Sequence, residues 1–383
     1  MGRDFAGLLR AELANAAGAV AELKAHGFEP EAFIARAAAH LSGRTTSQVT
    51  GQVTPPLPED IAELPRGDAE RRALIELGLS VLAEGACALV VLAGGMATRM
   101  GGVVKALVPA VDDQRFLDLR LREVATLGAR CPLWLMTSEA TEAPLRRALQ
   151  EEPGATLSAN LSVSSFRQDL SLRFTSSGAL LRGAEGELMS HAPGHGDLPD
   201  ALARSGLLTH FMASGGRLVL ITNVDNLGAC LDPLLIGWHL SHGAEVSCEV
   251  VDKQGTDRGG VPVRLDGRPV ILEELRLPAS FDPSQVSVFN TNTFWVNAQA
   301  LAALPQSEHR FSYFAVEKRH GERRFLQLER LLGEITSFLP TRFVRVPRDG
   351  AAARFLPVKD HDELIARQDT IRQVLAARRI WPA

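Results

Sequence analysis

The chain has 383 residues and a formal net charge of −4, and 45% of its residues are hydrophobic. This composition is typical of a soluble globular protein, and it offers no basic surface for a nucleic acid. We find no signal peptide and no apolar run of 18 residues, so we expect a cytoplasmic protein without a membrane or nucleic-acid partner. The four cysteines lie far apart and form no CxxC pair, which favours buried thiols over a zinc site.

The first 57 residues differ in pattern from the rest of the chain. Residues 4–42 are rich in alanine, with leucine and phenylalanine at helical spacing, which predicts helices. The polar stretch 43–57 ends in two prolines and predicts a linker. We therefore expect a helical N-terminal segment and linker over residues 1–57, followed by a catalytic domain over residues 58–383. The sequence does not indicate an oligomeric state.

From residue 67 onward, helical and strand-like patterns alternate along the chain. The pattern over residues 67–85 predicts an amphipathic helix, with Asp68 as its cap and Gly85 at its end. An all-apolar strand is expected within residues 86–95. Further helices are predicted over residues 116–129, 143–152 and 198–206, and further strands over residues 132–137, 161–166 and 216–226. This alternation predicts an α/β fold with a doubly wound, mostly parallel sheet.

Residues 246–297 are richer in strand-forming residues than the rest of the chain. A hairpin is expected around Asp266 and Gly267, because Asp-Gly favours a tight two-residue turn. We interpret this region as an antiparallel insertion that could form the wall of a second substrate pocket.

The stretch "VLAGGMATRMGGVVKALVPA", residues 91–110, places glycines directly after the first apolar strand. Gly94 and Gly95 would let backbone N–H groups converge on an anion, and Arg99 and Lys105 would add positive charge. The spacing fits neither a Walker loop nor the GxGxxG dinucleotide motif, which disfavours a nicotinamide-dependent dehydrogenase. The residues thus favour phosphate binding, and a purely structural glycine turn is the alternative.

Polar clusters at two later points suggest a ligand site. His195 lies between two glycines just before a predicted helix, where a neutral imidazole could donate to a phosphate. The alternative is a loop histidine ahead of an ordinary Asp197 N-cap. Asn223 and Asp225 follow an apolar strand, where open α/β sheets bind ligands, and they suit a divalent cation and sugar hydroxyls. An Asx-rich turn is the alternative there.

Two further features lie in the last hundred residues. Asn290 and Asn292 alternate with threonines, so both amides are predicted to face one side of a strand, where a sugar could bind them. Lys359 follows an apolar, strand-like run, although a lone lysine is usually a solvated charge.

Five blocks, "LAGGMATRMG…K", "PGHGD", "TNVDNLG…DP", "NTNTFWVN" and "RFLPVK", occur in this order over residues 88–365. Together they resemble the UTP–glucose-1-phosphate uridylyltransferase family, also called the UDP-glucose pyrophosphorylases. That family is related to the UDP-N-acetylhexosamine pyrophosphorylases. "FRQDL" and "FLQLERLLG" are similar to two shorter blocks of the family. The resemblance implies a Rossmann-like nucleotide-diphospho-sugar transferase fold that binds UTP and a sugar 1-phosphate.

The resemblance also implies a role for each matching residue. The nucleotide would be approached by Ala93, Gly94, Gly95, Gln168 and Gly194, with Gln168 reading the uracil. The candidate catalytic cations are Lys105, Lys359 and Arg99, and the sugar phosphate would be held by His195, Asn223, Asn290 and Asn292. Asp225 would bind Mg²⁺. Ala97 stands where the family usually has glycine, so the loop could bend differently.

The expected reaction is UTP plus glucose 1-phosphate giving UDP-glucose and pyrophosphate, by in-line attack on the α-phosphorus. The alternatives are the same chemistry on galactose 1-phosphate or N-acetylglucosamine 1-phosphate, or a catalytically silent nucleotide-sugar sensor. Eukaryotic members of the family carry a C-terminal β-helical domain, for which this sequence has no room after Lys359. We therefore expect a short form of the family.

Overall fold

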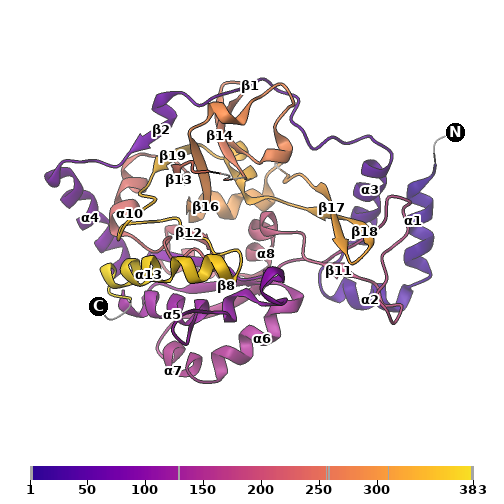
Figure 1. Cartoon of the computed structure of the whole chain (residues 1–383), viewed down its shortest axis with the longest axis horizontal. Helices are drawn as coiled ribbons and strands as arrows, with labels where there is room; N and C mark the ends of the chain where they lie inside the picture. The colour runs from indigo at the N-terminus through magenta and orange to yellow at the C-terminus, as the bar shows by residue number, and fades with distance from the viewer. Residues whose placement is uncertain (1–2, 128–129, 256, 258, 309, 381–383) are drawn as a thin grey trace.

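An eight-stranded sheet forms the centre of the computed structural model, which describes residues 3–127, 130–255, 257, 259–308 and 310–380 (Figure 1). The strand order is β2-β19-β13-β16-β12-β3-β8-β9. The bounds are β2 Ile61–Glu63, β3 Cys87–Leu92, β8 Leu133–Thr137, β9 Val163–Arg167, β12 Leu218–Asn223, β13 Val246–Asp252, β16 Val288–Asn297 and β19 Thr341–Arg345. Only β16 runs antiparallel to its neighbours. The prediction of a doubly wound, mostly parallel sheet is therefore confirmed.

Apolar side chains on both faces of the sheet hold two layers of helices. In β3, Cys87, Leu89 and Val91 point into one core, and the residues between them point into the other, as the two-residue period of a strand requires. The first core is covered by α4 Asp68–Ala83, α5 Phe116–Thr126, α6 Glu139–Gln150, α7 Gly154–Ser158, α10 Pro233–Ser241 and α13 His361–Ala377. The second is covered by α8 Leu198–Ser205, α9 Leu207–Ala213, α11 Ala298–Ala303 and α12 Ile335–Phe338. None of the described helices combines the length and the apolar character that a membrane crossing needs.

Several helix ends differ from the sequence predictions. The prediction that Asp68 caps α4 is wrong, because Gly67 occupies the cap position and Asp68 is the first helical residue. Helix α6 begins earlier than predicted, because the N–H of Ser138 donates to the hydroxyl of Thr141 and caps the first turn. The predicted end of α5 at residues 128–129 lies outside the described residues.

The β-rich region 246–297 contributes to two sheets. Strands β14 Val261–Leu265 and β15 Arg268–Leu272 form the predicted hairpin, with positive φ at both turn residues, Asp266 and Gly267. In contrast, β13 and β16 belong to the central sheet and not to an insertion. Part of the predicted linker also pairs with the hairpin, as strand β1 Val53–Thr54.

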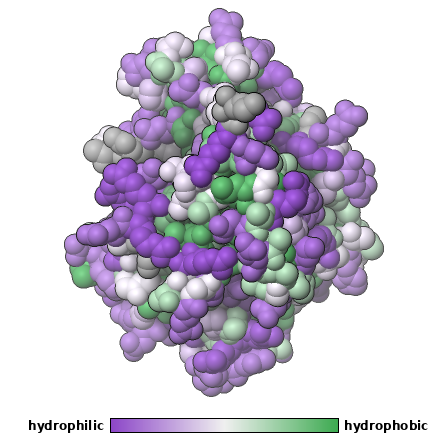
Figure 2. Space-filling view, turned by 90° about the vertical axis from the view of Figure 1, so that its right-hand side faces the viewer, coloured by the Kyte–Doolittle hydropathy of each residue, from purple (hydrophilic) through white to green (hydrophobic). Residues whose placement is uncertain are grey.

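The N-terminal helices α1 Phe5–Ala14, α2 Ala17–Ala25 and α3 Pro30–Leu41 pack at one end of the molecule (Figure 1). Leu9 and Phe33 share a core with Phe174 and with Leu328 of the hairpin β17 Phe314–His320 and β18 Arg323–Glu329. The outer surface at this end is mainly hydrophilic, with small apolar patches (Figure 2). The apolar side chains of these helices therefore pack against the rest of the chain and anchor the N-terminal segment to it.

The remaining described strands form three short antiparallel pairs. They are β4 Met96–Ala97 with β5 Val103–Val104, β6 Pro109–Val111 with β7 Gln114–Arg115, and β10 Ser171–Leu172 with β11 Ser190–His191.

Two glycines allow α4 and α10 to pack closely on each other. A Cβ atom at Gly78 would lie 1.9 Å from the carbonyl oxygen of Pro233. A Cβ atom at Gly237 would lie 2.0 Å from the carbonyl oxygen of Leu74. Neither contact leaves room for a methyl group, so the separation of the two helices depends on both glycines.

We predict that Gly78→Ala lowers the free energy of unfolding by about 1–3 kcal/mol, because the added methyl group forces the helices apart. In an exposed helix the same change is normally stabilising, by about 0.5–1 kcal/mol. Gly18→Ala in α2 is the matched control, since a Cβ atom there meets nothing within 4 Å. Urea denaturation measures both variants, and a Gly78→Ala variant as stable as the Gly18→Ala control would contradict the prediction.

Candidate active site

Two adjoining cavities lie where the parallel strands β3 and β12 end. The pairing of Asn223 with Leu92 brings the loops after both strands to the same edge of the sheet. The first cavity has a volume of about 370 Å³ and is lined by residues that include Gly94, Gly95, Lys105, Gln168, Gly194, His195, Asn223 and Asp225. The second, of about 260 Å³, is lined by residues that include His195, Asn223, Glu273, Asn290, Asn292 and Lys359. His195 and Asn223 line both, so the two cavities adjoin each other, and together they are called the cleft below.

The glycine bend and Gln168 lie against each other in the first cavity. A Cβ atom at Gly94 would lie 3.2 Å from the amide nitrogen of Gln168, so glycine leaves room for that amide. The carbonyl oxygen of Gly94 accepts a hydrogen bond from the hydroxyl of Ser138 at 2.9 Å. The N–H of Gln168 donates to the carbonyl oxygen of Thr137 at 3.0 Å. Both residues are thus fixed to the end of β8.

The ammonium of Lys105 and the carboxylate of Asp225 form an ion pair in the first cavity. Lys105 Nζ lies 2.8 Å from Asp225 Oδ2, and the same oxygen accepts the N–H of Val358 at 3.0 Å. Both charged groups are largely buried. Each charge compensates the other, and an incoming anion must compete with Asp225 for Lys105.

His195 is held in a single neutral form at the junction of the cavities. Its Nδ1 accepts the N–H of Leu332 at 2.8 Å, so the ring proton is on Nε2. Burial lowers the pKa of His195 to about 4, which keeps the ring neutral at pH 7. His195 can therefore donate from Nε2 to an anion in the cleft without carrying a charge.

Asp197 occupies the N-cap position of α8, but its side chain makes no capping hydrogen bond. Its carboxylate accepts the N–H of Asp169 at 2.7 Å and Nη1 of Arg330 at 2.9 Å. These contacts tie the loop that carries His195 to the segment that carries Gln168.

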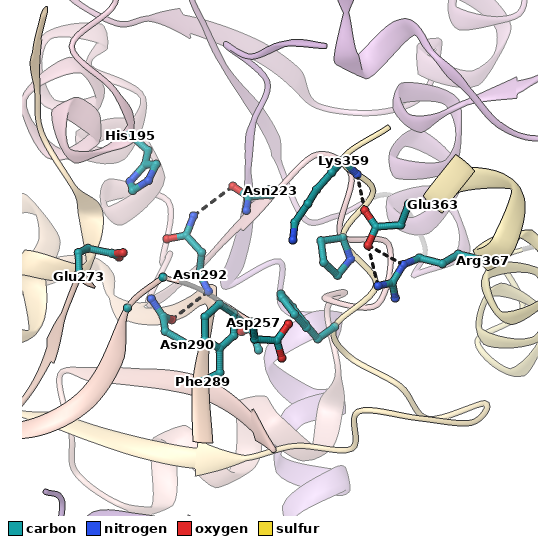
Figure 3. A pocket seen from close by; sticks show the side chains of 15 residues that line it. His195, Asn223, Asp257, Glu273, Phe289, Asn290, Asn292, Lys359, Glu363 and Arg367 are labelled. Carbon is teal, nitrogen blue, oxygen red and sulfur yellow. Dashed lines mark hydrogen bonds and ion pairs between the residues drawn. The ribbon is translucent and has the colours of Figure 1, made fainter. Parts of the chain in front are cut away.

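Asn290 and Asn292 both line the second cavity, but simple alternation along β16 is not the reason. The strand bulges opposite β13 between Asn290 and Phe294, and Asn292 adopts a left-handed φ of 56°. The Asn292 amide donates to Asn223 Oδ1 at 3.1 Å, as Figure 3 shows. Asn292 Oδ1 is buried and accepts no hydrogen bond from the described residues. A ligand donor would satisfy it.

Lys359 reaches the second cavity from the C-terminal part of the chain. The strand-like run before it forms no regular secondary structure. The N–H of Lys359 donates to Glu363 Oε2 at 2.7 Å, and Asp360 caps α13 by accepting the N–H of Glu363. In Figure 3 the side chain of Lys359 extends into the cavity, on the side away from Glu273.

Two predicted site residues do not line either cavity. Ala93 is fully buried, and its N–H donates to the carbonyl oxygen of Met136 at 2.9 Å. Arg99 is exposed on the short 3₁₀ turn Thr98–Met100. Their suggested roles stay predictions.

Comparison with known proteins identifies the family. A model of the UTP–glucose-1-phosphate uridylyltransferase family matches residues 56–378. The chain belongs to this family. A relative of that name from Astragalus penduliflorus is 27% identical and covers 90% of this chain and 74% of its own length. One from Saccharomyces cerevisiae is 32% identical and covers 74% of this chain and 60% of its own length.

Solved structures support the fold. UDP-glucose phosphorylase from Trypanosoma brucei matches with a TM-score of 0.74 at 24% identity, and covers 91% of this chain and 77% of that one. The uridine diphosphate N-acetylglucosamine pyrophosphorylase of the same organism matches with a TM-score of 0.73 at 20% identity, and covers 97% and 85%. The chain is thus an enzyme of the uridylyltransferase family, and its structural relatives include pyrophosphorylases named for two different sugars.

The sequence analysis missed one residue that lines the uridylyltransferase cleft and one that supports it. Glu273 lines the second cavity, and burial raises its pKa to about 7. Arg120 is fully buried and donates to the carbonyl oxygens of Asn223 at 2.9 Å and Asn226 at 2.7 Å, which fixes the loop after β12. No local pattern singles out either residue, and the two carbonyl groups that Arg120 holds in place are 103 and 106 residues away in the sequence.

We predict that the contribution of His195 to the free energy of unfolding decreases as the pH falls from about 6.5 toward about 4. The pKa of His195 is 6.5 in the unfolded chain and about 4 in the folded protein. Above pH 6.5 the ring is neutral in both states, whereas below it the unfolded chain binds the proton first and is favoured. At about pH 4.5 this one group removes about 2–3 kcal/mol of stability.

Urea denaturation of the wild type and of His195→Gln at several pH values isolates this contribution. As the pH falls, the free energy of unfolding of the variant should decrease less than that of the wild type. His191, whose pKa burial also lowers to about 4, is present in both proteins, so its contribution cancels. Equal slopes for the variant and the wild type would contradict the assignment of His195 as a buried neutral residue.

Proposed function

We propose that the protein transfers the uridylyl group of UTP to glucose 1-phosphate, giving UDP-glucose and pyrophosphate. The observation that carries this proposal is the pair of cavities that share His195 and Asn223. One contains a glycine bend with Lys105, and the other contains amides, a carboxylate and Lys359. A nucleotide and a sugar phosphate would thus meet at the shared residues. The names of the curated relatives support glucose as the sugar, and a relative from Leishmania major was crystallised with UDP-glucose.

In this proposal an oxygen of the sugar phosphate attacks the α-phosphorus of UTP. The new P–O bond forms as the bond between the α-phosphorus and its bridging oxygen breaks, and pyrophosphate leaves with the bonding electrons. The attacking oxygen is already an anion, so no general base is required. The protein has to align the two anions and to neutralise their charge.

Each half of the cleft offers groups for one substrate. The uracil would lie against Gln168, and the triphosphate against the N–H groups of the Gly94–Gly95 bend and the ammonium of Lys105. Nε2 of His195 would donate to the sugar phosphate. Sugar hydroxyls would donate to Asn292 Oδ1, which lacks a donor among the described residues, and to Glu273.

The residues present also fit Mg²⁺ bound together with the nucleotide. Among the described residues no group of three or more His, Cys, Asp or Glu side chains could hold a metal ion alone. Mg²⁺ is commonly held by one or two carboxylates together with substrate phosphates. Asp225 can supply that carboxylate, since both of its short contacts fall on Oδ2. A bound cation would neutralise charge on the phosphate oxygens.

We predict that pyrophosphate release from UTP requires both a sugar 1-phosphate and Mg²⁺. The panel contains the 1-phosphates of glucose, galactose and N-acetylglucosamine, each tested with Mg²⁺ and with a chelator. Glucose 1-phosphate should give the highest kcat/KM. Preference for another sugar would replace the proposed substrate, and no release with any sugar would favour the nucleotide-sugar sensor.

We predict that Lys359→Ala lowers kcat by more than about tenfold, equivalent to more than about 1.4 kcal/mol in the barrier. The loss should fall on kcat because Lys359 would neutralise the negative charge that the two phosphates bring together, and this charge is most concentrated in the transition state. Lys24→Ala is the control, since Lys24 is an exposed lysine of α2 outside the lining of the cleft. An unchanged kcat in Lys359→Ala would remove this residue from the mechanism.

A further inference from the structure

We propose that the N-terminal helices take part in nucleotide selection by clamping the segment that carries Gln168. This inference rests on the proposed function, in which Gln168 meets the uracil. Gln168 directly follows β9, the outermost strand of the central sheet, so only β8 supports it within the sheet. The corner between α2 and α3 supplies the second support.

Two consecutive residues of this corner contact the two neighbours of Gln168. Nη2 of Arg167 donates to Nδ1 of His26 at 2.5 Å. Gly27 has a φ of +90°, and a Cβ atom there would lie 2.6 Å from Asp169 Oδ1. The corner therefore holds Gln168 from both sides along the chain.

The opposite side of this segment is fixed to the catalytic domain. The N–H of Asp169 donates to Asp197 Oδ2 at 2.7 Å, and the carboxylate of Asp169 pairs with Arg204 at 2.5 Å. Asp197 is fully buried and lies two residues after His195. Asp169 is thus held between the N-terminal corner and the loop that joins the two cavities.

A third contact links α3 to the same cluster. The guanidinium of Arg36 lies 3.9 Å from the centre of the Tyr313 ring, and that of Arg330 lies 5.2 Å from the same centre. Arg330 in turn donates to Asp197. The ring of Phe33 packs edge-on against Phe174, six residues after Gln168, at 5.8 Å. A displacement of the corner would therefore displace the segment that meets the base.

Gly27→Ala tests this inference, and Gly43→Ala is its matched control. Both glycines belong to the N-terminal segment and have a left-handed φ, so both substitutions strain the backbone. Only the methyl group at Gly27 meets Asp169, since a Cβ atom at Gly43 has nothing within 4 Å. The measurements are KM and kcat for UTP and CTP, KM for glucose 1-phosphate, and the thermal midpoint of each full-length variant.

We expect Gly27→Ala to raise KM for UTP by about fivefold or more and to reduce the preference for UTP over CTP by a similar factor. KM for glucose 1-phosphate should not change, and Gly43→Ala should resemble the wild type. The inference is overturned if Gly27→Ala keeps the wild-type KM and base preference, or if Gly43→Ala changes them equally. A general loss of packing would instead lower the thermal midpoint and impair both substrates.

His26→Leu provides a second test if Gly27→Ala does not fold, because it removes the contact with Arg167 from an exposed position. Its preference for UTP over CTP should also fall, and an unchanged preference would overturn the inference. Calorimetric titration with each nucleotide separates this inference from the proposed function. Binding of UTP without turnover would refute the transfer reaction but still measure the base preference, whereas a wild type that binds neither nucleotide would refute both.

Discussion

The carboxylate of Asp225 determines how the two halves of the cleft meet. One of its oxygens receives the ammonium of Lys105, from the loop after β3, and the N–H of Val358, from the segment before α13. The next residue is Lys359, so this single oxygen brings together the two lysines that the proposed reaction requires. Lys105 and Lys359 are separated by most of the catalytic domain in sequence. Residues 353–359 form no regular secondary structure, and this contact is one of several side-chain contacts that fix them.

Buried polar and charged side chains hold the segment before Lys359 and the loop after β12 in place. Asn226 accepts the N–H of Leu356 at 2.8 Å and donates to the carbonyl oxygen of Arg354 at 3.1 Å. The guanidinium of Arg354 pairs with Glu249 through two contacts of 2.7 Å, while Arg120 holds the carbonyl oxygens of the loop after β12. Burying such charges is unfavourable unless they are paired and hydrogen-bonded. In this protein the buried charged side chains position backbone segments that have no regular secondary structure. Apolar packing alone orients such segments poorly.

The sequence predicted those features that depend on neighbouring residues. The apolar run of β3, the Asp266-Gly267 hairpin and the glycine bend all follow from local patterns, and the polar residues after β3 and β12 meet because parallel strands end at one edge. Features that depend on distant partners were missed. For Asp197 the local pattern indicates only an N-cap position, whereas the partners of its carboxylate, Asp169 and Arg330, are 28 and 133 residues away. Similarly, the bulge in β16 depends on its pairing with β13. Alternation along the strand correctly predicted that Asn290 and Asn292 lie in the same cavity, but the bulge is what brings them there.

The charges of the cleft also bear on how a divalent cation would bind in the proposed reaction. In the protein alone, Lys105 and Asp225 neutralise each other. A bare triphosphate would have to take Lys105 from Asp225, and a buried carboxylate without a counter-charge is unfavourable. If the triphosphate arrived with a divalent cation, Asp225 would stay compensated and Lys105 would be free to contact phosphate. His195 adds no charge to this balance, because burial lowers its pKa and keeps the ring neutral at pH 7. In the proposed reaction the neutral ring would orient the sugar phosphate through a hydrogen bond, and the two lysines and a divalent cation would neutralise the phosphate charge.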